Sequence, residues 1–290
     1  MPSLKDLRNR ISSVKSTKKI TSAMKMVAAA KLKRAQENAE RTRPYASKMR
    51  EIVFSLTEKV NKSNFKFGNK SNSNNVLFIV CSSDRGLCGG FNGSIIKYTK
   101  NLADEYKKKG KVTKFIFIGK KAYLSLKRLY NDFIIENIQD FANPSIKFEV
   151  AGTVRDNILD LFLKNEICEC QLIFTEFKSA ISQTVKSIKL LPVDEENNKD
   201  DDLGKSSTYE YEPNEEIILD EIIPRNIAIQ IHSGLLENLA SEQGSRMTAM
   251  DNATRNANDM IDNLTLFYNR SRQALITKEL IEIISGAEAI

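Results

Sequence analysis

The chain of 290 residues has no tryptophan, one histidine and four cysteines. This scarcity removes most of the side chains that metal centres and nucleophilic catalysis need. Neither Cys81 with Cys88 nor Cys168 with Cys170 has CxxC spacing, and His232 lies far away in sequence. We expect reduced thiols, buried or in strands, in a cytosolic setting, with no cofactor and no active site. A redox switch at Cys168 and Cys170 is the alternative.

The sequence also lacks long apolar runs. None approaches the roughly 18 to 20 residues that a membrane-spanning helix needs. Charges throughout residues 1–20 exclude a secretory signal, and a heptad repeat that begins at once argues against a transit peptide. We expect a protein that is not integral to a membrane, and the missing presequence favours a bacterial chain over a processed mitochondrial one.

The two ends of the chain carry opposite charges and similar heptad repeats. Residues 1–60 hold 15 Lys and Arg against 5 Asp and Glu, a net charge of +10, whereas residues 210–290 hold 6 against 14, a net charge of −8. Because long-range attraction and apolar burial both favour their pairing, we expect helices at 1–60 and 225–290 to form one antiparallel coiled-coil shaft. Its seam residues are Leu4, Leu7, Ile11 and Val14, and Ala257, Met260, Leu264, Phe267, Ser271 and Ala274.

Between these helices the hydrophobic period changes to that of strands alternating with helices. Residues 76–83 form a continuous apolar run, typical of a strand that is buried on both faces. Four further strand segments follow, and only a short turn separates the last two, which predicts an antiparallel pair. We expect a Rossmann-like α/β domain at 76–193 with a mainly parallel sheet, inserted between the two halves of the coiled coil. A loop and linker at 194–224 would follow it.

Prolines mark the boundaries that we expect in the two helices. Pro44 predicts a kink in one helix from about residue 3 to 60, since proline lacks an N–H and its ring clashes with the preceding turn. Pro224 fits near the start of the C-terminal helix, where a missing N–H costs least.

A glycine-rich turn, SSDRGLCGGFN (82–92), follows the first strand, where α/β proteins often bind phosphate. Its spacing is neither GxGxxG nor GxxxxGK[ST], and no phosphate-facing lysine follows in register. We interpret it as a structural turn whose glycines allow close backbone packing. An α/β nucleotide-binding enzyme is the alternative function.

The basic N-terminal helix raises a second alternative, a basic coiled-coil adaptor for nucleic acid, through KLKR (31–34). However, Leu and Ala interleave with these charges, no aromatic residue precedes Tyr45, and an acidic helix is available in the same chain. We therefore expect no nucleic-acid partner. His232 is expected to pack on a helix face among Ile227, Ile231, Leu235 and Leu239.

Several stretches, in order along the chain, resemble the gamma subunit of F-type ATP synthases. They are KDLRNRISSVKSTKKITSAMKMVAAAKLKRA (5–35), RPYA (43–46), SSDRGLCGGFN (82–92), SEQGSRMTAMDNAT (241–254), RQALITKEL (272–280) and ITKELIEIISGAEA (276–289). They cover both ends and the middle, and on these motifs the chain is identified as a member of that family.

The resemblance implies a non-catalytic rotor subunit in a central stalk. In that family the terminal helices form a coiled coil inside a head of alternating alpha and beta subunits, and the α/β domain joins the epsilon subunit and the membrane c-ring. Proton flow turns the ring and the shaft, whose uneven profile drives the beta subunits through their states in sequence. Catalysis occurs in beta. The implied location is peripheral, on the cytoplasmic face of the bacterial inner membrane.

The resemblance also implies roles for single residues. Coupling contacts to the beta subunits are expected at Met24, Lys25, Glu242, Gln243, Arg246, Arg272 and Gln273. The C-terminal tip has apolar residues on more than one face, as expected of a single helix in a protein sleeve. This upper bearing comprises Leu280, Ile281, Ile283, Ile284 and Ile290.

The sequence departs from the family at two points. Gly244 stands where the family often has alanine, which bears on the local stiffness of the helix. The chloroplast-type regulatory insertion is not recognisable, and Cys168-Glu-Cys170 does not match its spacing, so we expect no thiol control of rotation.

Overall fold

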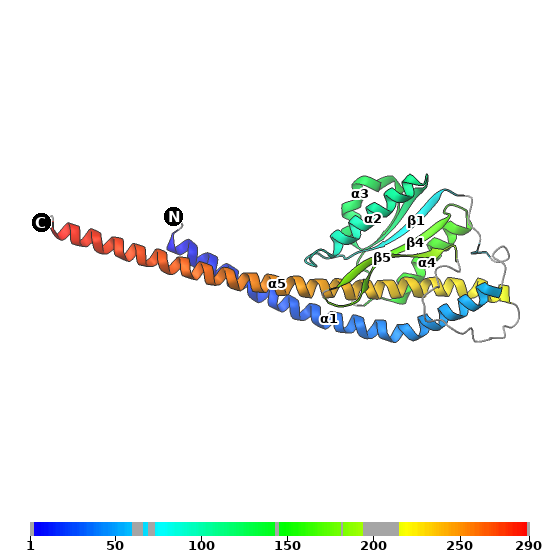
Figure 1. The fold of residues 1–290 in the computed structure, drawn as a ribbon, viewed down its shortest axis with the longest axis horizontal. Coiled ribbons are helices and arrows are strands. Elements are labelled where there is room, and N and C mark those ends of the chain that lie inside the picture. The colour runs from blue at the N-terminus through cyan, green and yellow to red at the C-terminus, as the bar shows by residue number, and fades with distance from the viewer. Residues whose placement is uncertain are drawn as a thin grey trace. The chain divides into compact units, whose positions relative to one another are not determined.

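The computed structural model describes residues 3–59, 66–68, 73–142, 145–180, 182–193 and 215–288. The chain divides into two compact units, residues 1–29 with 246–290 (unit 1) and residues 30–245 (unit 2). Figure 1 shows the elements in the order of the chain. They are α1 (Leu4–Lys59), β1 (Asn75–Cys81), α2 (Phe91–Lys108), β2 (Val112–Ile118), α3 (Lys120–Tyr130), the 3₁₀ helix η1 (Asn131–Phe133), β3 (Ile134–Ile138), α4 (Phe148–Leu163), β4 (Glu169–Phe177), β5 (Gln183–Leu191) and α5 (Glu215–Glu288).

The C-terminal helix starts earlier than the sequence pattern indicates. We expected it near residue 225, with Pro224 at its start, but α5 begins at Glu215 and Pro224 lies inside it. Leu219 and Ile223 are fully buried in the core of unit 2, and burying two such side chains offsets the roughly 3 kcal/mol cost of an internal proline. Residues 194–214 of the expected linker lie outside the described residues.

The N-terminal helix begins with a cap formed by Ser3 and Asp6. The N–H of Asp6 donates to the Ser3 hydroxyl at 3.1 Å, and the Ser3 N–H donates to an Asp6 carboxylate oxygen at 3.3 Å. This reciprocal pattern satisfies backbone donors that the first turn leaves free. Helix α1 then continues without interruption through Pro44. The kink at Pro44 stays a prediction.

The sheet of unit 2 has the strand order β3-β2-β1-β4-β5. The first four strands are parallel and β5 is antiparallel to β4, which confirms the mainly parallel sheet with a final antiparallel pair. Strand β1 lies at the centre, where Ile79 is opposite Ile116 on one side and Leu172 on the other. Residues 76–81 are all buried, so the continuous apolar run follows from a strand covered on both faces.

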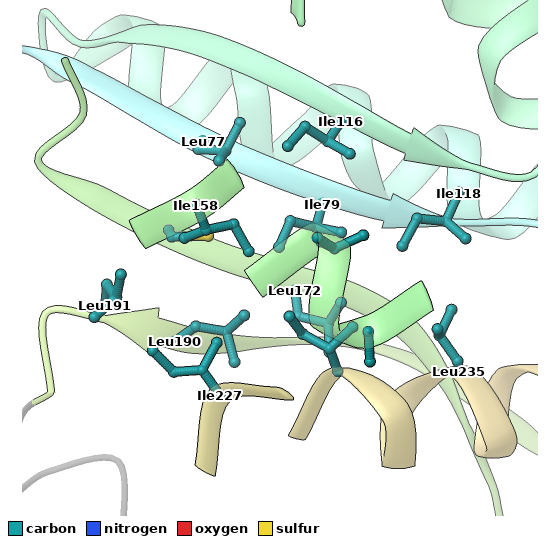
Figure 2. Close-up of a cluster of buried hydrophobic side chains, with 14 of the residues drawn as sticks. Leu77, Ile79, Ile116, Ile118, Ile158, Leu172, Leu190, Leu191, Ile227 and Leu235 are labelled. Carbon is teal, nitrogen blue, oxygen red and sulfur yellow. The ribbon is translucent and has the colours of Figure 1, made fainter. Parts of the chain in front are cut away.

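Two hydrophobic clusters cover the two faces of this sheet. Helices α2 and α3 pack on one face, around Phe78, Phe115 and Leu126. On the other face α4 and the part of α5 in unit 2 pack on Leu77, Ile79 and Leu172, with Leu56 of α1 in the same cluster. Figure 2 shows Ile158 of α4, and Ile227 and Leu235 of α5, beside these strand side chains. The domain therefore has three layers, with α5 as part of its own core.

Unit 1 contains an antiparallel pair of helices, formed by the start of α1 and the later part of α5 (Figure 1). The hydroxyls of Thr21 and Thr254 are 2.8 Å apart, and Lys25 Nζ lies 2.6 Å from Asp251 Oδ1. Residue numbers therefore rise along one helix as they fall along the other, which confirms the antiparallel pairing of the two ends.

The expected seam is closed over only part of its length. Leu7 and Ala257 are buried, with 1% and 7% of their surface exposed. In contrast, Met260 is 51% and Phe267 41% exposed, and Ala274 is exposed too, so the burial predicted for these three seam residues within one chain is wrong. Two helices cover less than the full circumference of each other, and large side chains at the margin of a two-helix contact stay in solvent.

Candidate functional site

The glycine-rich turn after β1 is held by its own side chains. The Asn92 amide oxygen accepts a hydrogen bond from the Ser83 N–H at 3.2 Å, and the Asn92 amide nitrogen donates to the Ser83 hydroxyl at 2.7 Å. The predicted structural turn is confirmed. The predicted reason is wrong for Gly90, because a Cβ there would meet nothing within 4 Å. Gly89 has a φ of 56°, a left-handed conformation that favours glycine, so glycine serves this turn through its backbone freedom as well as the polar pair of Ser83 and Asn92.

Helix α5 occupies the place where open α/β sheets usually bind ligands. That place is the crevice at the carboxyl ends of the strands where the strand order reverses, here between β1 and β4. The hydroxyl of Ser241 donates to the Thr175 carbonyl of β4 at 3.0 Å. The hydroxyl of Ser245 donates to the Cys88 carbonyl, in the turn after β1, at 2.7 Å. The nucleotide-binding alternative therefore loses its expected site to the chain's own helix.

An aspartate near the same strand ends has a perturbed pKa with a structural cause. Burial raises the pKa of Asp84, and the Lys120 N–H, which donates to its carboxylate at 3.1 Å, acts in the opposite direction. The nearby charge of Asp140 raises this pKa further. Because Lys120 is the first residue of α3, Asp84 serves to bind a backbone donor at the start of that helix.

His232 and the cysteines are placed in packing roles. The His232 ring contacts the edge of Phe148 with centroids 5.4 Å apart, and burial lowers its pKa, so the imidazole is neutral near pH 7. All four cysteines are free and buried, and burial raises the pKa of the Cys81 and Cys170 thiols. Within the described ranges, no group of three or more His, Cys, Asp or Glu side chains is placed to hold a metal ion.

The predicted coupling residues of α1 lie in unit 1, beside α5. Lys25 pairs with Asp251, whose other carboxylate oxygen accepts a hydrogen bond from Arg255 at 2.5 Å. Hydrogen bonds from Lys25 and Arg255 lower the pKa of Asp251 and keep it ionised. Met24 is half-buried. The opposite charges of the two chain ends thus meet in a direct ion pair at Lys25.

The predicted coupling residues of α5 differ widely in exposure. Glu242, Gln243 and Arg246 are 7%, 5% and 9% exposed, and the Gln243 amide lies 3.3 Å from the Glu242 carboxylate. Arg272 and Gln273 are exposed. The structure therefore divides these residues into a buried group and an exposed group.

The predicted bearing residues are all exposed where the structure describes them. Leu280, Ile281, Ile283 and Ile284 have 53% to 67% of their surface in solvent, and Ile290 lies outside the described residues. No helix of the described part of the chain has an apolar stretch long enough to cross a membrane.

Sequence reasoning missed the contacts that Asn238 and Ser241 make with β4 and that Ser245 makes with the turn after β1. The available signal is their spacing of three and four residues, which places three hydrogen-bonding side chains on one helix face. The spacing gives the common face, but the identity of the backbone groups that they bind depends on where β1 ends.

These features define a class of protein before any comparison is made. One chain pairs its own ends as helices, inserts an α/β domain between them, and fills the ligand crevice of that domain with one of the helices. This is the class of stalk-like proteins, in which a pair of terminal helices carries an inserted α/β domain.

Comparison with known proteins identifies the family. The family model "ATP synthase" matches residues 3–290. ATP synthase gamma chains of Rhodospirillum rubrum, Pelagibacter ubique and Paracoccus denitrificans are 50%, 49% and 48% identical, each over 100% of both chains. The chain belongs to the ATP synthase gamma-chain family.

Solved structures agree with this assignment. The central stalk of the Tetrahymena thermophila mitochondrial ATP synthase is 30% identical with a TM-score of 0.59, over 81% of this chain and 99% of that one. The rotor of the Euglena gracilis mitochondrial ATP synthase has a TM-score of 0.68 over 94% of this chain and 98% of that one. Its identity of 18% supports the shared fold alone.

Proposed function

We propose that this chain is the central-stalk rotor of a proton-translocating F-type ATP synthase, which couples proton flow through a membrane ring to ATP synthesis or hydrolysis in beta subunits. One observation carries the proposal: the helix pair of unit 1 leaves α5 with exposed apolar side chains over its last turns. A helix with apolar groups on several sides needs a surrounding protein surface. Full-length identity of about half to gamma chains supports the same role.

The partners then follow from the role. They are the alpha and beta subunits of the catalytic head, the epsilon subunit and the membrane c-ring. The beta subunits carry out the chemistry, and this chain supplies no catalytic group and no cofactor. Because its relatives of about 50% identity are bacterial, we place it as a peripheral subunit on the cytoplasmic face of the bacterial inner membrane.

Different segments perform different tasks in this proposal. Residues 1–60 and 225–290 form the shaft, and the start of α5 at Glu215 extends the C-terminal helix into the core of the α/β domain. The α/β domain at 76–193 joins the epsilon subunit and the ring. Torque applied to that domain passes to the catalytic head through the long helices.

The exposure of the coupling residues divides their proposed roles. Arg272 and Gln273 are exposed and contact a beta subunit directly, since a guanidinium beside an amide suits reversible polar contacts. Glu242, Gln243 and Arg246 have little free surface, so they act by fixing the helix and not by direct contact. Met24 and Lys25 act at the junction of the two helices, where Lys25 is already paired with Asp251.

Co-purification tests the rotor role. A tagged full-length chain, expressed with the other subunits of its own operon, should bring down an alpha/beta hexamer, an epsilon subunit and a c-ring. ATP hydrolysis by the purified complex should depend on the tagged chain. Recovery of the folded chain alone, with neither hexamer nor ring, would sink the proposal.

A pair of arginine variants tests the two proposed roles. Arg272→Ala should leave the thermal stability of the isolated chain within about 1–2 °C of wild type, because surface changes are mostly small. Proton pumping by the assembled enzyme should fall. Arg246→Ala changes a buried side chain and should lower both stability and pumping. Equal losses of assembly and activity for both variants would contradict a contact role for Arg272.

A further inference from the structure

A polar face interrupts the apolar packing of α5 in unit 2. Gly234, Asn238, Ser241 and Ser245 follow one another at spacings of four, three and four residues, so they share one side of the helix. The preceding turns dock through Leu219, Ile223, Ile227, Ile231 and Leu235, which are all buried in the hydrophobic core. The helix therefore docks on its domain in two ways, first by apolar packing and then by hydrogen bonds.

The polar face of α5 takes the place of a missing strand. Strand β1 pairs with β4 only as far as Ile173, so Thr175 lies beyond the end of that ladder, and it is 2% exposed. Its N–H donates to the Asn238 amide oxygen at 3.2 Å, and its carbonyl accepts a hydrogen bond from the Ser241 hydroxyl at 3.0 Å. Buried backbone groups need partners, and here two side chains of α5 supply both.

Two further contacts hold the same stretch of α5. The Ser245 hydroxyl donates to the Cys88 carbonyl in the turn after β1. At Gly244, a Cβ would lie 3.2 Å from the Phe177 ring and 3.4 Å from the Ala180 backbone, so glycine allows the end of β4 and the turn after it to approach the helix. Residues 238–245 are thus held by strand β4, by the turn after β1 and by the turn after β4.

This polar face leaves some buried polar atoms unsatisfied, which a purely apolar contact would avoid, and this argues that it has a task beyond stability. Asn238 Nδ2 and Thr175 Oγ1 are buried without a hydrogen-bond partner among the described residues. A buried polar group without a partner is unfavourable, and an apolar side chain of similar size often serves a core better. What buried polar contacts add is a unique register.

We propose that Asn238, Ser241 and Ser245 are positioning residues that fix the rotational register of α5 on the α/β domain, so that torque passes between domain and helix without slip. This proposal rests on the proposed rotor function. Apolar side chains keep much of their contact when a helix turns or shifts by one turn. Hydrogen bonds to the Thr175 and Cys88 backbone are directional and are lost by the same movement. The polar face therefore resists rotation where the apolar face resists only separation.

The test uses the complete ATP synthase in liposomes and the double variant Ser241→Ala/Ser245→Ala. Two readouts are taken together: the rate of ATP hydrolysis, and the protons pumped per ATP against an imposed proton gradient. Hydrolysis without a gradient should stay within about two-fold of wild type, whereas protons pumped per ATP against the gradient should fall about three- to ten-fold. Load is essential, because slip appears only when the ring resists rotation.

Matched variants separate register from packing. Ser233→Ala removes a hydroxyl of the same size from the same helix but outside the polar face, and it should keep the wild-type ratio of protons to ATP. Ser245→Thr keeps the hydroxyl that binds the Cys88 carbonyl, and it should also keep the wild-type ratio. A loss of ratio in the alanine double variant, with both controls intact, supports the proposal.

The remaining outcomes also support or overturn the proposal. An unchanged ratio in the double variant, together with a lower melting temperature of the complex, would show that the polar face only stabilises the fold and would overturn the proposal. If the double variant does not assemble, Ser245→Ala alone decides, because Ser245 is only half-buried. A fall of its ratio by about two-fold supports the proposal, and an unchanged ratio overturns it. A wild-type chain that fails to assemble with head and ring contradicts the rotor function itself.

Discussion

Two stretches of helix α5 lie in opposite environments, one buried and one exposed to solvent. In residues 226–245 of α5 every side chain is buried or half-buried, whereas in residues 272–285 every one is exposed. Both stretches are rich in isoleucine and leucine. Helix propensity does not separate them, and most helical stability in proteins comes from the packing of an apolar face. The first stretch receives that packing from its own chain, whereas in the proposed rotor role the second receives it from another protein.

The largest expected effect is the difference between two leucine-to-alanine variants, one in each stretch of α5. Leu235→Ala removes a fully buried side chain and should lower the free energy of unfolding by about 2–5 kcal/mol. Leu280→Ala, at a residue that is 53% exposed, should change it by less than about 0.5 kcal/mol. Urea unfolding of the full-length chain, followed by circular dichroism, measures both. Similar losses for the two variants would show that the tip is already packed within the free chain.

A second prediction concerns how closely the end of β4 and the turn after it pack against the buried stretch of α5. Gly244→Val should lower the free energy of unfolding by about 1–3 kcal/mol, because the added methyl groups meet Phe177 and Ala180. Gly152→Ala in α4 is the matched control, since its Cβ would meet nothing within 4 Å, and it should raise stability by up to about 1 kcal/mol. Thermal unfolding distinguishes the two signs. A stabilising Gly244→Val would mean that α5 is not closely approached there.

A third prediction tests the ion pair that joins the two helices of unit 1. Lys25→Glu places a like charge beside Asp251 and should speed hydrogen exchange of the backbone amides around both residues by up to about five-fold. Lys25→Gln should have a smaller effect. Added salt should reduce the difference between the variants, because the pair is partly exposed. Exchange that is identical in both variants at low salt would mean that the pair contributes nothing to helix pairing.

The smallest expected effect is a pH dependence from the only histidine. Burial lowers the pKa of His232 in the folded chain, so the unfolded chain binds a proton more readily, and stability should fall as the pH drops below about 6.5. Between about pH 7.5 and 5.5, His232→Phe should lose about 1–2 °C less in melting temperature than wild type.

Glu237 acts in the opposite direction, which makes the comparison with wild type necessary. Burial raises its pKa, helped by the nearby Glu176, so its contribution to stability grows as the pH falls. Both chains share this contribution, and it cancels in the difference. Equal pH slopes for wild type and His232→Phe would remove His232 as a source.

The sequence predicted the elements of unit 2 well because their patterns are local. The apolar run that became β1 and the final antiparallel pair need only short-range hydrophobic periodicity. Charge and heptad spacing likewise predicted that the two ends pair in antiparallel fashion. The start of α5 was wrong because a proline is tolerated inside a helix when Leu219 and Ile223 are buried, and that burial depends on tertiary structure.

The candidate site was harder to predict because its key contacts are between distant residues. Exposure divides the family-implied residues, and no local signal indicates that Glu242 is 7% exposed while Arg272 is exposed. The polar face of α5 is visible in the sequence as a spacing. Its role depends on the pairing of β1 with β4, which ends at Ile173 and leaves Thr175 without a strand partner on that side. Such an end of pairing is known only once the sheet is assembled.

The exposed tip of α5 also affects how long the chain survives in the cell before it is assembled with other subunits. Leu280, Ile281, Ile283 and Ile284 place an apolar surface in water while the rest of the chain has its core in place. Apolar patches of this kind promote self-association and attract chaperones and proteases. We therefore expect an orphan copy to be short-lived in the cell although it is correctly folded. Supply of the other subunits, and not folding, then sets how much of this chain survives.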